Sequence, residues 1–102
     1  MQLSDEIKLK ENSWIAKMAA RRMKAYSVAL VLGKTIHLFN ISKEEFRASP
    51  KLIRHEMKHV EQYEQLGFIK FLIIYLWYSY RFGYYNNPLE IEARNAEETA
   101  DS

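Results

Sequence analysis

The segment SPKLIRHEMKHVEQYEQLG, residues 49–67, decides the fold, because it has the pattern of one complete helix with chemically active side chains on one face. Ser49 and Pro50 are residue types preferred at the N-cap and the first position of a helix. Gly67 is typical of the residue that ends a helix. The segment therefore predicts a helix that starts at Pro50 and stops at Gly67.

The same segment contains the pattern HExxH. His55 and His59 are four residues apart, so they project from one helix face and their imidazoles can bind a single ion. Glu56 follows His55 and lies roughly 100° further around the helix. From there its carboxylate can reach a water held on the ion rather than the ion itself. This arrangement is typical of a zinc-dependent peptidase.

A catalytic zinc site needs a third protein ligand, because it keeps only its fourth position for water. The extension HExxHxxGxxH is absent, since Gln62 stands at its glycine position and Gln65 at its histidine position. A glutamate on a later helix is the other solution. The segment NPLEIEA, residues 87–93, offers Glu90 in the first turn of a helix, with Glu92 as the alternative.

The remaining sequence predicts a small α+β domain that is mostly helical. Two β-prone runs flank Gly33 and Lys34, which indicates a β-hairpin. Ser42 and Glu45 have the spacing of a capping box at the start of a short helical turn. No repeat or linker divides residues 1–102, so we expect a single domain. The expected elements are a helix over about 5–24, strands over 26–32 and 35–39, a short helix before 50, and helices over 50–66, from 68 to 81 or 85, and from 88 onward.

The composition is that of a globular protein and argues against several functional classes. Hydrophobic residues make up 48% of the chain and charged residues 27%, which is ordinary for a folded domain. The net charge of +2 is too small to indicate nucleic-acid binding. The absence of cysteine excludes a disulfide scaffold and a cysteine-ligated metal site. Because no secretory signal is recognisable, the expected location is the cytoplasm.

Aromatic residues concentrate in one segment of the second half of the chain. Nine of the fourteen lie between Phe68 and Tyr85. A membrane-spanning helix needs about 20 apolar residues, and this apolar run is shorter and contains Lys70, so we expect no transmembrane span. The segment is predicted to be a core helix. Aromatic rings are also common at membrane interfaces, so the alternatives are peripheral membrane contact, or an oligomer formed through this helix or the C-terminal tail.

Together these motifs resemble the gluzincin class of zinc metallopeptidases, and especially its smallest members, the minigluzincins. The resemblance spans roughly residues 28–94: a hairpin, an HExxH helix, an aromatic helix and a Glu-x-x-Ala helix. It implies a minimal zincin-like catalytic domain with a thermolysin-like site. In that site one zinc ion would be bound by His55, His59 and Glu90, with Glu56 as the general base.

Many members of that class have an aspartate four residues after the ligand glutamate, where it orients the first histidine. This chain has Arg94 at that position. An outer partner of this kind matters, because its loss can lower metal affinity or activity by roughly 10- to 100-fold. The sequence therefore leaves open which group holds the second ring nitrogen of His55.

The expected activity is the zinc-dependent hydrolysis of a bond within a peptide or protein substrate. Zinc would lower the pKa of its water to about 7 and polarise the scissile carbonyl. Glu56 would take the water proton and later pass it to the leaving amine. Gluzincins often stabilise the oxyanion with a tyrosine or histidine, for which Tyr84, Tyr85 and His37 are the candidates.

The substrate is expected to bind as an added β-strand. The predicted strand Thr35–Phe39 would offer an open edge to an extended peptide, with Thr35, His37 and Phe39 along it. A chain this small has little room for deep side-chain pockets, so we expect weak sequence preference.

Two alternatives concern whether a zinc site would turn over substrate. The enzyme would be latent as made if the carboxylates of Glu97, Glu98 or Asp101 in the tail ligated the zinc. The protein would instead be a zinc-binding interaction module with little turnover if the aromatic helix served to bind a partner.

A third alternative is a metal-free helical interaction protein. His55 and His59 would then be ordinary histidines paired with acids. Glu90 would be the third helical residue of a capping box with Asn87 as the N-cap.

Overall fold

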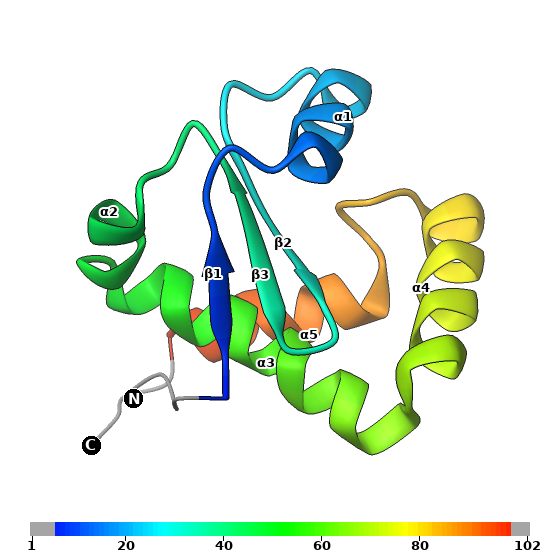
Figure 1. Ribbon diagram of the computed structural model, residues 1–102. Coiled ribbons are helices and arrows are strands. Elements are labelled where there is room, and N and C mark those ends of the chain that lie inside the picture. The colour runs from blue at the N-terminus through cyan, green and yellow to red at the C-terminus, as the bar shows by residue number, and fades with distance from the viewer. Residues whose placement is uncertain (1–5, 99–102) are drawn as a thin grey trace.

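The computed structural model describes residues 6–98, which form a three-stranded sheet and five helices (Figure 1). The predicted α+β class and mostly helical character are confirmed. The helices α3 and α5 lie side by side, with α3 against the sheet, whereas α4 stands to one side, beyond β2 (Figure 1). In chain order the elements are β1 (Lys8–Lys10), α1 (Trp14–Met23), β2 (Val28–Leu32), β3 (Thr35–Phe39), α2 (Lys43–Arg47), α3 (Pro50–Leu66), α4 (Phe68–Phe82) and α5 (Pro88–Glu97).

The sheet has the strand order β1-β3-β2. β2 and β3 form the predicted antiparallel hairpin, in which Leu32 pairs with Thr35 across the turn. Gly33 in this turn has a φ of 64°, a left-handed conformation that glycine adopts without strain. β1 pairs in parallel with the other edge of β3. In the described part of the chain, β3 is therefore the central strand and β2 is an outer strand.

The prediction that Thr35–Phe39 offers an open edge is wrong. β1 covers residues 35–37, so that His37 pairs with Lys10 on one side and with Leu30 on the other. Just beyond β1, the backbone N–H of Ser13 donates to the carbonyl of Leu38 at 3.1 Å. Thr35, His37 and Phe39 therefore lie on a strand that has no free edge for a peptide along most of its length.

The prediction of one helix from Asp5 to Lys24 is wrong in its first half. β1 forms there because Leu9 is half-buried between two exposed lysines, the two-residue period of a strand. Asn12 then takes a φ of 54°, which is incompatible with a continuous helix. Ser13 caps α1 by accepting a hydrogen bond from the N–H of Ala16 at 3.3 Å. Asp5 itself lies outside the described residues.

The core lies between the sheet and α3. It combines inward-facing residues of β2 and β3 with residues of α2, α3 and α4. The hydroxyl of Tyr63 in α3 donates to the carbonyl of Val31 in β2 at 3.0 Å, which ties α3 to the outer strand. The buried members of this cluster are Val31, Ile36, Leu38, Phe46, Ile53, Val60, Tyr63 and Phe71.

The helix α3 begins and ends where the sequence predicted. Ser49 accepts a hydrogen bond from the N–H of Leu52 at 3.3 Å, and Pro50 is the first helical residue. Gly67 has a φ of 86°, which ends α3 and lets α4 start at Phe68. The chain turns at Gly67, so that α4 stands across from β2 (Figure 1).

Candidate metal centre

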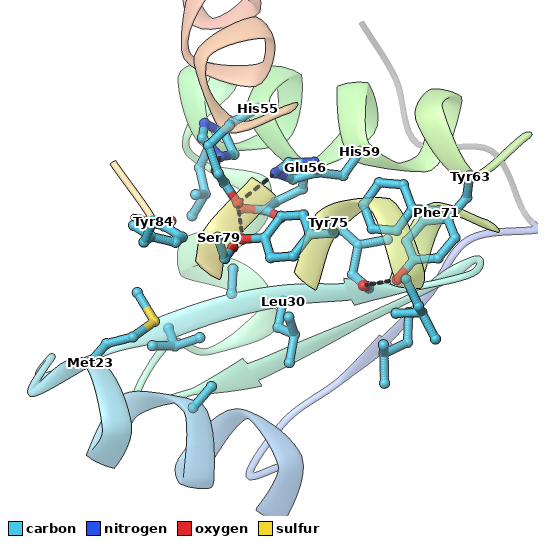
Figure 2. A pocket seen from close by; sticks show the side chains of 18 of the residues that line it. Met23, Leu30, His55, Glu56, His59, Tyr63, Phe71, Tyr75, Ser79 and Tyr84 are labelled. Carbon is cyan, nitrogen blue, oxygen red and sulfur yellow. Dashed lines mark hydrogen bonds and ion pairs between the residues drawn. The ribbon is translucent and has the colours of Figure 1, made fainter. Parts of the chain in front are cut away.

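Two histidines of α3 and one glutamate of α5 meet at the contact between these helices. The Nε2 atom of His55 lies 3.1 Å from Oε1 of Glu90, and Nε2 of His59 lies 3.2 Å from its Oε2. One ligand atom from each of the three residues lies within 4.8 Å of the others. The three side chains form a group that can hold a metal ion, and both imidazoles point toward the same space (Figure 2).

Glu90 is placed by the start of α5. Asn87 caps this helix by accepting a hydrogen bond from the N–H of Leu89 at 2.8 Å. The buried amide of Asn87 also donates to the carbonyl of Tyr75 at 3.1 Å and to Oγ of Ser79 at 2.9 Å, which anchors α5 to α4. In a capping box the Glu90 carboxylate would accept from the backbone N–H of Asn87. That N–H donates to the carbonyl of Tyr84, and the Glu90 carboxylate faces the histidines. Glu90 is therefore not the acid of a capping box.

Gln62 fixes the orientation and the tautomer of His59. Its amide nitrogen donates to the carbonyl of Leu89 at 3.1 Å and to Oε1 of Glu92 at 2.6 Å. Its oxygen must then face Nδ1 of His59, at 2.9 Å. Nδ1 is consequently the donor, and the lone pair of Nε2 points toward Glu90. Glu92, the alternative ligand from the sequence, supports Gln62 instead of joining the site.

Glu97 performs the same task for His55. Its Oε2 lies 2.6 Å from Nδ1 of His55, so this nitrogen donates and Nε2 is directed toward Glu90. Arg54 holds the end of α5 in place by donating twice to the carbonyl of Glu97, at 3.1 and 2.8 Å. Glu97 thus supplies the acid that is missing at Arg94, whose guanidinium lies 4.0 Å over the ring of Tyr85.

Of the tail carboxylates considered for latency, those of Glu97 and Glu98 lie outside the ligand group. Glu97 binds the outer nitrogen of His55 rather than the position between the ligands. Glu98 lies 3.5 Å from Nζ of Lys51 at the surface. Asp101 lies outside the described residues.

The group His55, His59 and Glu90 needs a positive charge or protons between its facing atoms. With both Nδ1 protons engaged, two nitrogen lone pairs and a carboxylate face one another, an arrangement that is stable only with protons or a cation between them. Burial alone would lower the pKa of His55 and His59 and raise that of Glu90. Their mutual hydrogen bonds outweigh burial, so the pKa values of both histidines lie above their ordinary value and that of Glu90 lies below it. Protons on Nε2 and a metal ion therefore compete for the same position.

Glu56 is a buried acid beside this group. Only 4% of its surface is exposed, and it lines the cleft next to His59 (Figure 2). Burial raises the pKa of Glu56 to about 8, with opposition from the positive charge of His59 and reinforcement from Glu90 and Glu97. A cation held by the ligands would oppose this rise, because a nearby positive charge favours the carboxylate.

Two tyrosines reach the ligand group, and the sequence predicted one of them. The hydroxyl of Tyr75 donates to Oε2 of Glu90 at 2.5 Å. Tyr84 lines the same cleft, and burial followed by the charge of Glu90 raises its pKa. Tyr85 is 69% exposed and does not line the cleft. Tyr75 was missed, although its spacing of four residues from Phe71 marks the inner face of α4.

The group His55, His59 and Glu90 lies at one side of a cleft of about 730 Å³. Residues 27–32, which include all of β2, line the cleft together with side chains from α1, α3 and α4. Leu30 of β2 lies across from Tyr75 in Figure 2. The strand beside the site is therefore β2. The sequence had suggested β3 instead. His37 is absent from this lining and is buried with its Nδ1 2.8 Å from Oγ of Ser13.

No family model, curated protein or solved structure matches the chain. Among residues 6–98, no helix combines the length and apolar character needed to cross a membrane.

Proposed function

We propose that this protein is a zinc metallopeptidase in which Glu56 is the general base. The observation that carries the proposal is the burial of the Glu56 carboxylate beside the group His55, His59 and Glu90, at the side of a cleft. A buried acid next to a three-ligand metal group is an arrangement suited to hydrolysis, because the acid can move a proton without binding the metal.

The donor set supports zinc in particular. Two imidazole nitrogens and one carboxylate are typical of catalytic zinc sites, in which the fourth position is left for water. Both histidines donate their outer N–H to an acceptor, Glu97 or Gln62, as metal-ligating histidines usually do. When bound there, zinc would polarise a carbonyl and lower the pKa of its water.

Proton transfer falls to Glu56. As a carboxylate it would accept the proton of the attacking water, and as a carboxylic acid it would deliver that proton to the leaving amine. Its pKa of about 8 without a cation, and the lowering that a cation would cause, bring it toward the pH at which both directions of transfer are efficient.

The oxyanion would receive a hydrogen bond from a tyrosine. We assign this task to Tyr84, which lines the cleft near Glu90. Tyr75 already donates to the ligand carboxylate at 2.5 Å, so its hydroxyl is better placed to hold Glu90. Tyr85 is excluded by its position outside the cleft.

The substrate would bind along β2. The hairpin turn makes Leu32 and Thr35 a hydrogen-bonded pair. In an antiparallel ladder such pairs alternate with pairs that are not hydrogen-bonded to each other, so the backbone N–H and C=O groups of Val31 and Ala29 point away from β3. The carbonyl of Val31 indeed accepts from Tyr63 on that side. The N–H of Val31 and both backbone groups of Ala29 therefore form the edge to which an extended peptide would pair.

The variant Glu56→Gln tests the proposal, since it keeps the size of the side chain and removes its proton-accepting carboxylate. Purified wild type and variant would be loaded with zinc, checked for one zinc per chain and assayed on a mixture of fluorogenic peptides. We expect both to bind zinc and only the wild type to cleave, with a loss of at least about 100-fold for the variant.

A matched control is Glu61→Gln, because Glu61 is an exposed acid of the same helix that pairs with Lys58. It should cleave like the wild type. Equal cleavage by wild type and Glu56→Gln would contradict the assigned base. Zinc binding without cleavage by any of the three proteins would instead favour the zinc-binding interaction module.

A further inference from the structure

The helix α4 has two faces of different character. Phe71 and Tyr75 point inward, toward α3 and the metal centre. The opposite face carries large apolar side chains that are between 57% and 84% exposed. Their spacing of four, three, one and three residues places them in one line along the helix. This outer stripe consists of Ile69, Ile73, Leu76, Trp77 and Tyr80.

Such a stripe is more than the scattered exposure that every protein surface shows. Single exposed apolar residues are ordinary, whereas a contiguous apolar patch marks a surface that contacts something other than water. The stripe also includes Trp77 and Tyr80, whose ring centroids lie 6.2 Å apart. Tryptophan and tyrosine are the side chains enriched at the interface between a membrane and water.

The charges beside the outer stripe indicate its partner. Lys70 and Arg81 are exposed near its two ends, and α4 contains no Asp or Glu. A second copy packed antiparallel through the stripe would bring Lys70 against Arg81, and a parallel copy would bring each against its equivalent. Both arrangements place like charges together, which is destabilising. An anionic lipid surface complements the same charges.

The length of α4 determines how it would sit. Its 15 residues extend over roughly 22 Å, less than the hydrocarbon thickness of about 30 Å. A helix with one apolar face flanked by basic residues lies in the plane of the interface instead of spanning it. We propose that α4 binds anionic membrane surfaces, with the outer stripe inserted among the lipid headgroups. Because Leu76 also lines the cleft, the cleft would open beside the membrane.

Trp77 offers a direct reporter. The full chain with Trp14→Phe retains Trp77 as its one tryptophan. It would be mixed with vesicles of phosphatidylcholine containing phosphatidylserine, and separately with vesicles of phosphatidylcholine alone. We expect Trp77 emission to shift to shorter wavelength, and the protein to sediment with the vesicles, mainly in the anionic sample and less at high salt.

Variants on α4 separate the two contributions. Lys70→Gln with Arg81→Gln should weaken binding to anionic vesicles by about 10- to 30-fold, as expected for the loss of two basic residues near the surface. Leu76→Ser should weaken binding to both kinds of vesicle. Tyr26→Ser, which changes an aromatic side chain that is 84% exposed outside α4, should bind like the parent.

Each contrary result would overturn the proposal. One is no emission shift and no sedimentation with anionic vesicles, with the circular dichroism of a folded protein. Another is unchanged binding by the double variant at Lys70 and Arg81. A third is a dimer seen by analytical ultracentrifugation that buries Trp77 without lipid, which would assign the outer stripe to a second copy. None of these results depends on peptidase activity.

Discussion

Two regions of the molecule each bury a histidine, and they shift its pKa in opposite directions. His59, at the contact of α3 and α5, faces the Glu90 carboxylate, and despite burial its pKa lies above the ordinary value. His37, in the central strand, faces the hydroxyl of Ser13, and burial together with the charge of Lys10 lowers its pKa.

The difference shows that burial alone does not suit a histidine to metal binding. At His59 the outer nitrogen is held by Gln62 and the inner nitrogen meets an anion and a second imidazole. At His37 no carboxylate approaches in the described part of the chain, and the ring serves as a hydrogen-bonded member of the sheet. A histidine suited to metal binding has its outer N–H held by an acceptor, so that its inner nitrogen is directed toward the position of the ion.

The largest effect on the candidate metal centre is expected from Glu90→Gln. This change removes the anion that both Nε2 atoms face, so metal affinity should fall by more than the roughly 100-fold upper value for outer partners. Isothermal titration with zinc would measure it. Glu92→Gln on the same helix should cost at most about tenfold, because Glu92 only supports Gln62. Equal losses for the two variants would contradict the assignment of Glu90.

The next effect is that of pH on zinc affinity. Protons on the Nε2 atoms of His55 and His59 compete with the metal, and the pKa values of both are raised. Affinity should therefore rise with pH through these values, by at most about 100-fold per pH unit when two protons are released. Titrations at several pH values, in buffers of different ionisation enthalpy, would count the protons. An affinity that does not change with pH would contradict the competition.

Metal-free stability should depend on pH in the opposite direction. The folded pKa values of His55, His59 and Glu56 are raised, so the stability they contribute is present at low pH and lost as pH rises through those values. The pKa of Glu90 is lowered, so the stability that Glu90 contributes is lost only well below pH 6. Glu90 therefore does not offset the loss of stability between pH 6 and 8. The Tm of chelator-treated protein should fall between pH 6 and 8, and the Tm of zinc-loaded protein should not.

A smaller effect separates the two outer partners of the histidines. Gln62→Leu and Glu97→Ala should each lower zinc affinity by about 10- to 100-fold. The loss should be greater for Gln62→Leu, because Gln62 is buried and the Nδ1–H of His59 would be left without an acceptor. Glu97 is partly exposed, so water can replace it at His55. Glu97→Gln retains an acceptor and should recover most of the affinity.

The smallest effect on the metal centre is expected from Ser13→Ala. It removes the N-cap of α1 and the partner of His37, at a cost of about 0.5–2 kcal/mol in the free energy of unfolding. Zinc affinity should not change, since Ser13 and His37 lie outside the ligand group. Chemical denaturation and zinc titration of the same preparation would check both statements.

The features that the sequence predicted correctly depend on interactions between residues close together in the chain. The helix α3 and its caps are local, so Ser49, Pro50 and Gly67 defined its limits correctly from the sequence. The pair of histidines follows from a spacing of four. Glu90 was reachable because Asn87 and Pro88 mark the start of α5, which fixes where the first turn lies.

The prediction that the aromatic segment forms a core helix is wrong for most of α4, in which only Phe71 is buried. The other errors concern contacts between distant segments. The short strand β1 joins β3 across more than twenty residues, and no local signal shows that it displaces a helix or covers an edge. The wrong choice of β3 rather than β2 as the substrate strand follows from this one missed strand. Gln62 and Glu97 became recognisable as histidine partners only when α5 was seen against α3.

The most direct test of the central claim compares the two buried histidines. Zinc content and affinity would be measured for the wild type, His59→Ala and His37→Ala, with circular dichroism to establish that each is folded. We expect one zinc per chain in the wild type and in His37→Ala, and no stoichiometric zinc in His59→Ala. A wild type that binds no zinc, or a folded His59→Ala that binds zinc as tightly as His37→Ala, would contradict the assignment of His59 as a zinc ligand.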